Sequence, residues 1–449
     1  MTEGNPALLM ISFAFPLMLA NLGQQLYMIV DAMIVGKGVG VEALAAVGAT
    51  DWSYWLVLWT VQALTQGFAI PVSQYFGEGN QENVRKAVTM SVRLCLTAGI
   101  LLTVISFIIA LPLLRLLKTP DDIFSGASAY LLIMYGGILV VTAFNMASSI
   151  LRAFGDGKTP MIAMAIAAGS NVLLDLLFVL VFRWGIAGAA AATVTAQLFA
   201  FFYCFLSLKK SEWLKLEKSD WQSDMNIIKC QYRLGVPLAL QHMLIAVGGM
   251  ILQSVINLQG FVFIAGFTAT NKIYGLLESS AISLGYAVTT YMAQNYGGGL
   301  PQRIRSGLKS ASLLAVLLSA VISAGMILGG RGILGLFIDQ RNVNAANVLE
   351  IAYHYLFVMS CLLSSLYLLY VFRNTLQSMG NATASLWSGI GELFARVFAA
   401  CVLTSMAGRE ALFYAEPLAW ISAMLIVAVV CLKKVWLEPE LKQKEKGKG

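Results

Sequence analysis

Long apolar runs separated by short polar segments dominate the chain from residue 7 onward. A membrane-spanning helix needs about 20 mostly apolar residues, and twelve runs reach that length. They predict transmembrane helices at 7–35, 46–75, 88–116, 124–151, 160–183, 186–208, 233–258, 263–296, 307–333, 346–376, 383–406 and 411–432. Pro16 and Pro237 fall inside the first and seventh of these. A proline there removes a backbone donor and favours a kink, so Pro16 is a candidate hinge.

The composition supports this interpretation. Of the 449 residues, 58% are hydrophobic and 12% are charged, and the mean hydropathy is +0.76. A soluble domain carries about 25% charged residues. The surplus of apolar surface therefore faces lipid, and the fold class predicted is an all-α polytopic membrane protein. The six cysteines show no CxxC or metal-ligand spacing, so we interpret them as small apolar residues.

Basic residues are distributed unequally between the two sides of the predicted bundle. The even-numbered connections and the C-terminal tail carry 21 of them, counting Arg373, and the odd-numbered connections carry seven. By the positive-inside rule both termini are cytoplasmic and the protein is a multi-pass protein of the cell (plasma) membrane. The net charge of +7 lies in short loops and the tail rather than on one solvated face, which argues against a nucleic-acid partner.

The two halves of the chain resemble each other in three segments that occur in the same order. These pairs are FPLMLANLGQQLYMIVD (15–31) with VPLALQHMLIAVGGMIL (236–252), QGFAIPVSQYFGEGNQENVRK (66–86) with LGYAVTTYMAQNYGGGLPQRIR (284–305), and LRAFGDGKTP (151–160) with LQSMGNATAS (376–385). Each half has six predicted helices that start on the same side, so the repeat is parallel. Such repeats occur in secondary transporters, with binding sites near the repeat interface; a duplication without mechanistic role is the alternative.

The repeat and the polar segments between its halves divide the chain into four parts. We predict an N-terminal six-helix lobe (1–208), a cytoplasmic linker (209–232), a C-terminal six-helix lobe (233–434) and a basic cytoplasmic tail (435–449).

Two carboxylates, Asp31 and Asp175, lie in otherwise apolar runs. A charge at that depth costs a few kcal/mol or more, and it marks a functional site by default. Asn171 shares a helix face with Asp175, and a rise of about 1.5 Å per residue places both, with Asp31 and Thr193, in the outer half of the first lobe. Carboxylate, amide and hydroxyl oxygens suit a hard cation such as Na⁺, whereas two close, desolvated carboxylates can instead hold a proton. Hydrogen bonding between helices is the structural alternative.

Other polar residues are weaker candidates for a substrate pathway. Gln24, Gln25 and Tyr27 precede Asp31 on its helix, and Glu278 lies in the eighth run. Glu392 and Arg396 are four residues apart and could form an intramembrane pair, for which the structural interpretation is favoured over the functional one. His242 is interpreted as a hydrogen-bonding residue between helices rather than a ligand.

The segments VDAMIVGKGVGVEALAAVGAT after the first predicted helix, GEGN and YGGG after the second and eighth, and LRAFGDGKTP before the fifth resemble the MATE family of multidrug and toxic-compound extrusion transporters, and the resemblance covers both halves of the chain. The resemblance implies export of organic cations, driven by inward flow of Na⁺ or H⁺ and by rocking of two lobes. It also implies a cation site in the N-lobe at Asp31, Asn171, Asp175 and Thr193. Some members carry acidic residues in helices 7 and 10; here helix 7 has none and helix 10 only Glu350 in its first turn, so a C-lobe coupling site is not expected.

The function expected is therefore that of a secondary active multidrug efflux antiporter, not of an enzyme. Its partners would be cationic or amphipathic drugs and the lipid bilayer, with Na⁺ or H⁺ as coupling ion, no other cofactor, and a monomeric state. The alternative is a flippase of a lipid-linked oligosaccharide or peptidoglycan precursor, which would need a cationic cavity that Lys272 and Arg396 hardly provide. An intramembrane enzyme is disfavoured because DDxxD, HExxH and a suitably placed GxSxG are missing.

Overall fold

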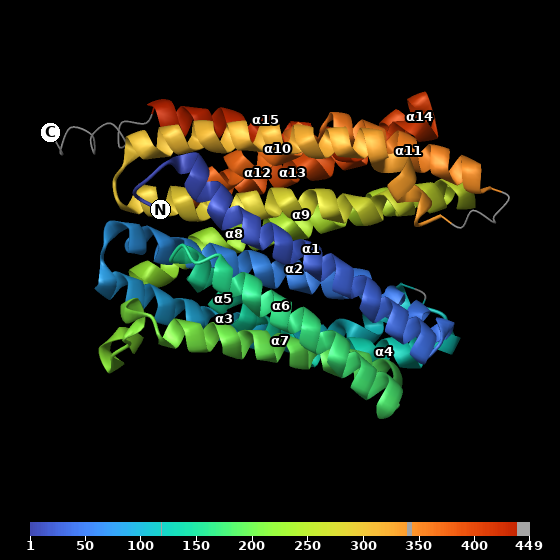
Figure 1. Cartoon of the computed structure of the whole chain (residues 1–449), viewed down its shortest axis with the longest axis horizontal. Coiled ribbons are helices and arrows are strands. Elements are labelled where there is room, and N and C mark those ends of the chain that lie inside the picture. Colours follow the sequence, from blue (N-terminus) through green and yellow to red (C-terminus); the bar gives the residue numbers. More distant parts are fainter. Residues whose placement is uncertain (118, 339–343, 438–449) are drawn as a thin grey trace. The chain divides into compact units, whose positions relative to one another are not determined.

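The computed structural model describes residues 1–117, 119–338 and 344–437, apart from the side chains of residues 26, 29, 41 and 52. Within these residues the chain is helical and has no strands, as predicted (Figure 1). Most of the predicted basic tail, from residue 438 on, lies outside the described residues. The helices are α1 (Pro6–Gly38), α2 (Val41–Glu78), α3 (Gln81–Leu116), α4 (Asp121–Gly136), α5 (Ile138–Ala153), α6 (Lys158–Asp175), η1 (Leu176–Val181), α7 (Gly185–Lys209), η2 (Glu212–Leu214), η3 (Lys218–Trp221), α8 (Met225–Ile256), η4 (Asn257–Gln259), α9 (Phe261–Gly297), α10 (Pro301–Gly335), α11 (Ala345–Cys361), α12 (Leu363–Ser378), α13 (Ala382–Val397), η5 (Phe398–Leu403), α14 (Thr404–Ala407), η6 (Arg409–Tyr414) and α15 (Ala415–Leu437).

The helices confirm a polytopic membrane protein. Nine helical segments of the described chain are long and apolar enough to cross a membrane, and two further spans are each a bent pair of helices, which gives up to eleven. The eighth predicted span, 263–296, corresponds to α9, which has 37 residues but is not among these eleven. Its length fits a span, whereas its composition, with Lys272 and Glu278 among many hydroxyl-bearing residues, is less apolar than that of the others.

The chain divides into two compact units. The first unit comprises residues 15–239, and the second unit comprises residues 1–14 together with 240–449. Both divisions fall inside a helix and beside a proline, at residues 14/15 of α1 near Pro16 and at 239/240 of α8 near Pro237. The unit boundaries thus differ from the sequence repeat, because each unit includes the beginning of the helix that opens the other half.

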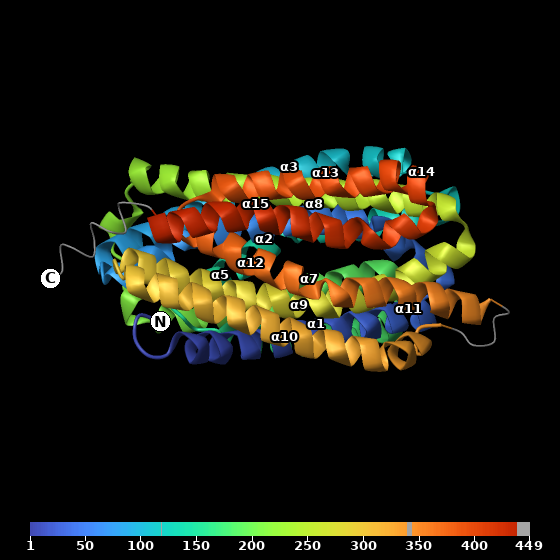
Figure 2. The same ribbon diagram turned by 90° about the horizontal axis from the view of Figure 1, so that it is seen from above.

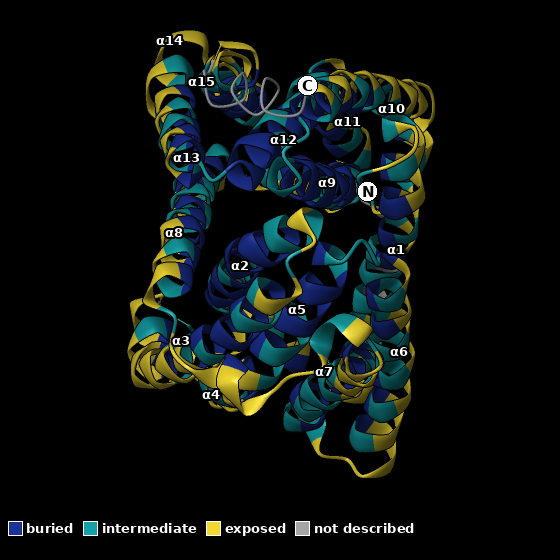
Figure 3. Ribbon diagram, turned by 90° about the vertical axis from the view of Figure 1, so that its left-hand side faces the viewer, coloured by how far each residue is buried: buried dark blue, intermediate teal, exposed yellow. Residues whose placement is uncertain are grey.

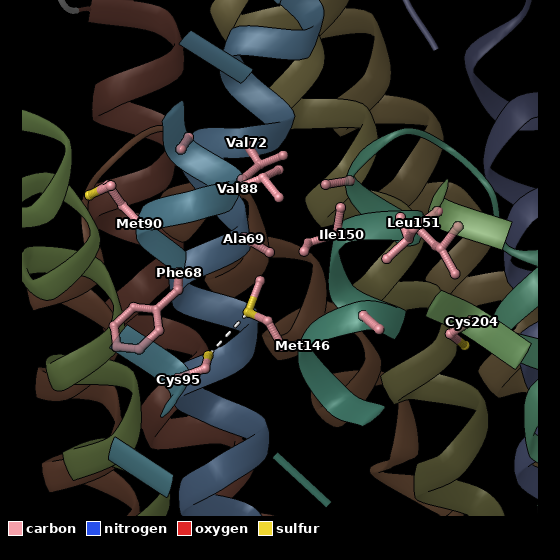
Figure 4. Packing of buried hydrophobic residues seen from close by; sticks show 14 of the residues in the cluster. Phe68, Ala69, Val72, Val88, Met90, Cys95, Met146, Ile150, Leu151 and Cys204 are labelled. Atoms are coloured by element: carbon pink, nitrogen blue, oxygen red, sulfur yellow. Dashed lines mark hydrogen bonds between the residues drawn. The ribbon is translucent and has the colours of Figure 1, made fainter. Parts of the chain in front are cut away.

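Within the first unit, α2 and α5 are mostly buried and α6 keeps an exposed outer face (Figure 3). Side chains of α2, α3 and α5, such as Phe68, Val88 and Ile150, form a hydrophobic core in this unit (Figure 4). Cys95 and Met146 meet there with their sulfur atoms 3.2 Å apart. The apolar faces of these helices therefore pack on one another, and the apolar outer faces of α3 and α6 remain for lipid.

The start of α8 is fastened to the first unit by close backbone packing. A Cβ atom on Gly67 of α2 would lie 2.4 Å from Cα of Gly235, so the two helices cross without side chains between them. Small residues at such crossings are typical of membrane helices. The buried Gln231 amide donates to the carbonyl oxygens of Phe68 (3.3 Å) and Ala87 (2.9 Å) and to Ser91 Oγ (2.7 Å).

The segment that links the halves is docked on the first unit rather than extended. Asp220 is 2% exposed, and its carboxylate lies 2.9 Å from Arg85 Nε and accepts from the backbone N–H of Glu217. Trp213 packs against Phe76 with ring centroids 4.7 Å apart. The predicted linker therefore belongs structurally to the first unit.

In the second unit, α12 lies between α9, α10 and α15, and α13 runs beside α15 (Figure 2). Met1 lies at one end of this unit, where its carbonyl oxygen accepts from Asn295 Nδ2 (3.2 Å) and Arg303 Nη2 (3.3 Å). The end of α15 is at the same end, because Arg305 Nε donates to the Val435 carbonyl oxygen at 3.2 Å. Which side of the membrane this is stays a prediction.

The repeat seen in the sequence recurs in the backbone. The pair α4–α5 bends by 44° and the pair α11–α12 by 47°. α6 and α13 each continue into a six-residue π-helix, η1 and η5. The two halves therefore share their irregularities as well as their regular helices.

Candidate cation site

The helix that carries Asn171 and Asp175 is started by a short local motif. Gly155 has a positive φ of 88°, which glycine adopts without steric cost. The following Asp156 carboxylate accepts from the backbone N–H groups of Lys158 and Thr159 at 3.0 Å, and thereby caps the first turn of α6. The same motif starts α13: Gly380 has a φ of 83°, and the Asn381 side-chain oxygen accepts from the backbone N–H of Ala384 at 3.2 Å. The segment LRAFGDGKTP and its counterpart are thus helix-start signals.

Asn171 and Thr193 join α6 to α7. Asn171 Nδ2 donates to Thr193 Oγ1 at 3.3 Å, and the Thr193 hydroxyl in turn donates to the Ala189 carbonyl oxygen at 3.1 Å. The Asn171 side-chain oxygen receives no hydrogen bond from the described chain although the residue is only 2% exposed. Both the amide oxygen and the hydroxyl oxygen therefore keep acceptor capacity for a further donor or cation.

Asp31 and Asp175 come together across α1 and α6. Their carboxylates are close enough to interact electrostatically. Asp175 is fully buried, neither of its carboxylate oxygens receives a hydrogen bond from the described residues, and the same holds for Oδ1 of Asp31. The C-terminal end of α1 is held against η1, since a Cβ on Gly38 would lie 2.6 Å from the Leu180 side chain. The predicted four residues are thus in one place within the first unit.

Tyrosines surround the carboxylates, and the sequence analysis identified only one of them. Tyr27, one turn before Asp31, hydrogen-bonds with Gln24 and interacts electrostatically with Asp31 and Asp175. Tyr130 of α4 interacts with Asp31 and with Tyr54 of α2. Tyrosines in apolar runs were the available signal for Tyr54 and Tyr130, but only the fold shows which of them face the site. Gln25 is half-buried, and no hydrogen bond of its side chain is found in the described part of the chain.

This arrangement of oxygens has a definite chemical character. Two carboxylates that face each other without a donor repel, and the repulsion is relieved by a proton shared between them or by a cation bound to both. No group of three or more His, Cys, Asp or Glu side chains suited to a metal ion occurs among the described residues. The donors that are present, two carboxylates, an amide and a hydroxyl, fit a hard monovalent cation or a proton.

The remaining candidates, Glu278, Glu392 and Arg396, lie in the second unit. Glu278 accepts from the Tyr370 hydroxyl at 3.1 Å. Glu392 and Arg396 form the predicted pair, 3.3 Å apart, but they do so within a larger set of charges. Arg373, counted in the sequence among the basic residues of the connections, is 6% exposed in α12 and is paired with Glu392. It lies inside the helix bundle because Glu392 neutralises it there. The sequence did not predict the burial of Arg373 or the pairing of Glu416 with Arg396.

A sequence model of the MatE family matches residues 16–177 and 237–400. YpnP of Bacillus subtilis (strain 168), named a probable multidrug resistance protein, is 32% identical over 68% of each chain. NorM of Thermotoga maritima, also named a probable multidrug resistance protein, is 23% identical over 74% of this chain and 73% of its own. The crystal structure of MATE in complex with MaL6 superposes with a TM-score of 0.89 at 21% identity, covering 98% of both chains. The resemblance seen in the sequence is thereby confirmed, as is the expectation of a transporter rather than an enzyme, and the chain belongs to the MATE family of multidrug efflux transporters.

Proposed function

We propose that this protein is a secondary active antiporter that exports cationic or amphipathic drugs in exchange for Na⁺ or H⁺. Family membership supports multidrug efflux. The exchange is supported by one observation in the first unit: the Asp31 and Asp175 carboxylates face each other with three oxygens that receive no hydrogen bond from the described chain.

The proposed mechanism follows from the charge of that site. With both carboxylates ionised and no cation present, the buried site carries two like charges at close range, which is costly in a medium of low dielectric constant. One proton or one Na⁺ lowers this charge. Occupation from outside therefore removes the negative charge that holds a cationic drug, and the drug is released to the outside. Reorientation then carries the ion inward, where its loss restores the charge.

Asn171 and Thr193 have a positioning role in this scheme. Their hydrogen bond fixes the amide so that its oxygen is turned away from Thr193 and stays available as an acceptor. A hard cation gathers several oxygen ligands, so these two oxygens complete the set that the carboxylates begin.

The flippase alternative receives no support from the second unit. A lipid-linked pyrophosphate would need basic side chains that are available to bind it. Arg396 is engaged by Glu416 at 2.8 Å and by Glu392 at 3.3 Å, and Arg373 is paired with Glu392. Lys272 is exposed and is a single charge.

The decisive experiment is an uptake assay in inverted membrane vesicles with a fluorescent organic cation. An Na⁺ gradient at equal pH, a pH gradient without Na⁺, and neither gradient are imposed in separate samples. We expect one of the two gradients to drive accumulation of the dye and to lose its effect in D175N vesicles. Accumulation that needs neither gradient, or that D175N leaves unchanged, contradicts the proposal.

A further inference from the structure

The second unit contains a chain of buried charges that the proposed mechanism does not use. It consists of Arg373 (α12), Glu392 and Arg396 (α13) and Glu416 (α15), hereafter the ion chain. The two arginines and Glu392 are 3–6% exposed, and the Glu416 side chain is 15% exposed. Its two positive and two negative charges balance.

Each charge in the ion chain is held by directed hydrogen bonds. Arg396 donates from Nε to Oε1 of Glu416 (3.0 Å) and from Nη2 to Oε2 (2.8 Å), the two-pronged geometry that makes arginine–carboxylate pairs strong. Its Nη1 donates to Oε2 of Glu392 (3.3 Å), whose other oxygen is bound by Arg373. With its amide oxygen turned toward Arg373, Gln241 accepts from Arg373 Nη1 at 3.1 Å.

Within the ion chain, Arg396 occupies the counterpart of the candidate cation site. Asn171 lies sixteen residues after Gly155, the glycine that precedes the capping residue of α6, and Arg396 lies sixteen residues after the equivalent Gly380. Counting from the π-helices gives nearly the same result, because Asp175 directly precedes η1 and Arg396 lies two residues before the start of η5. Arg396 therefore falls in the helical turn that corresponds to Asn171–Asp175.

The partner helices correspond as well. In the first unit Asn171 of α6 bonds to Thr193 of α7, and in the second unit Arg396 of α13 bonds to Glu416 of α15. The two sites differ in their acceptors. Three carboxylate oxygens of Asp31 and Asp175 receive no hydrogen bond from the described residues, whereas no buried oxygen of Glu392 or Glu416 is in that condition.

We propose that the Arg396 guanidinium is a built-in counter-cation, which takes in the second unit the place that an exchangeable cation takes in the first. This inference rests on the proposed function, because it takes the Asp31–Asp175 site to hold an exchangeable ion. By this inference one protein molecule binds one exchangeable cation, and Arg396 is the residue that restricts exchange to the first unit. Removal of its side chain opens a cation-binding site of guanidinium shape between Glu392 and Glu416.

The test is chemical rescue of R396A, measured as the thermal unfolding temperature of the purified full-length protein in detergent. We expect R396A to unfold at a lower temperature than wild type and to regain at least half of the loss with millimolar guanidinium. Choline at the same ionic strength should have no effect. The matched control is R331A, an arginine of α10 that stacks on Tyr353 at 4.7 Å, outside the ion chain. R331A and wild type should not respond to guanidinium.

Failure of guanidinium to stabilise R396A more than R331A overturns the proposal. If R396A does not fold, the double variant R396Q/E416Q tests the proposal instead, since it removes one positive and one negative charge from the ion chain together. Recovery of folded protein in the double variant supports charge compensation, and failure of the double variant refutes it. None of these measurements involves transport. Failure of the proposed function would be seen in the transport assay, and failure of this inference would be seen in the unfolding temperatures, so the two can be told apart.

Discussion

At the scale of single residues, the proposed exchange depends on Asp31 and Asp175. D31N and D175N each replace a carboxylate by a neutral amide of the same shape, which removes the charge that attracts a cation and the acid that holds a proton. We expect both variants to be produced at the wild-type level and to confer no more drug resistance than cells without the protein. Growth in the presence of an organic-cation drug, with immunoblots of the membranes, measures this. Wild-type resistance in both variants would contradict the assignment.

Thr193 tests whether the neutral oxygens contribute. T193V keeps the shape of the side chain and removes the acceptor of the Asn171 amide, which costs about 1 kcal/mol, or roughly a fivefold weaker ion affinity. The half-maximal ion concentration for dye transport should rise accordingly.

The control for T193V is T195V on the same helix, because the Thr195 hydroxyl donates to the Ala191 carbonyl oxygen at 2.7 Å, whereas the Thr193 hydroxyl accepts from Asn171. An equal effect of both substitutions would show a general effect on α7 rather than on the site.

The sequence was sufficient to select four residues that the fold brings together, because charges and amides in apolar helices are rare; that they bind the coupling ion stays a prediction. It was insufficient for the ion chain. Arg373 and Glu416 lie near the ends of predicted helices, where a charge ordinarily reaches solvent. Their burial depends on partners from α13 that only the tertiary fold brings to them.

At the scale of elements, the crossing of α2 and α8 at Gly67 and Gly235 leaves no room for a methyl group. G67A should lower the unfolding temperature in detergent, because overpacking costs typically 1–3 kcal/mol and the obstacle is backbone rather than a movable side chain.

G48A is the matched control for G67A. Gly48 lies on the same helix, and a Cβ added there would have nothing within 4 Å. Alanine is favoured over glycine in a helix by about 1 kcal/mol, so G48A should unfold at the same or a higher temperature than wild type. Equal unfolding temperatures for G67A and wild type would mean that the crossing is looser than described.

Helix positions were predictable from apolar runs, but their interruptions were not. The runs 124–151 and 346–376 proved to be bent pairs that break after Gly136 and Cys361, and the runs 160–183 and 383–406 include π-helices. Hydropathy reflects how favourably a residue transfers to lipid. It contains no information on where the backbone hydrogen-bond pattern of a helix changes to produce a bend or a π-helix. The repeat of these features in both halves is the additional signal, since an irregularity in one half predicts one in the other.

At the scale of the whole molecule, the segment between the halves is a structured part of the first unit. D220N removes the charge that pairs with Arg85 and leaves that arginine without its partner. We expect the segment to detach locally and trypsin to cleave after the exposed Lys215 and Lys218 several times faster than in wild type. Timed digestion of the purified protein measures the rate.

E212Q is the control for D220N. Glu212 is exposed, and its contact with the first unit is made by its backbone carbonyl oxygen, which accepts a hydrogen bond from the Gln81 side chain and is unchanged by the substitution. Equal cleavage rates in D220N and wild type would show that the apolar contacts of Trp213 suffice to hold the segment.

The exchange of helix beginnings between the units has a consequence for how the halves of the chain depend on each other. Residues 1–14 pack with the second unit, and residues 225–239 pack with the first. Neither half of the chain, taken alone, therefore contains every helix segment of one unit. Each half lends the start of its first helix to the other, the arrangement by which domain-swapped chains complete one another.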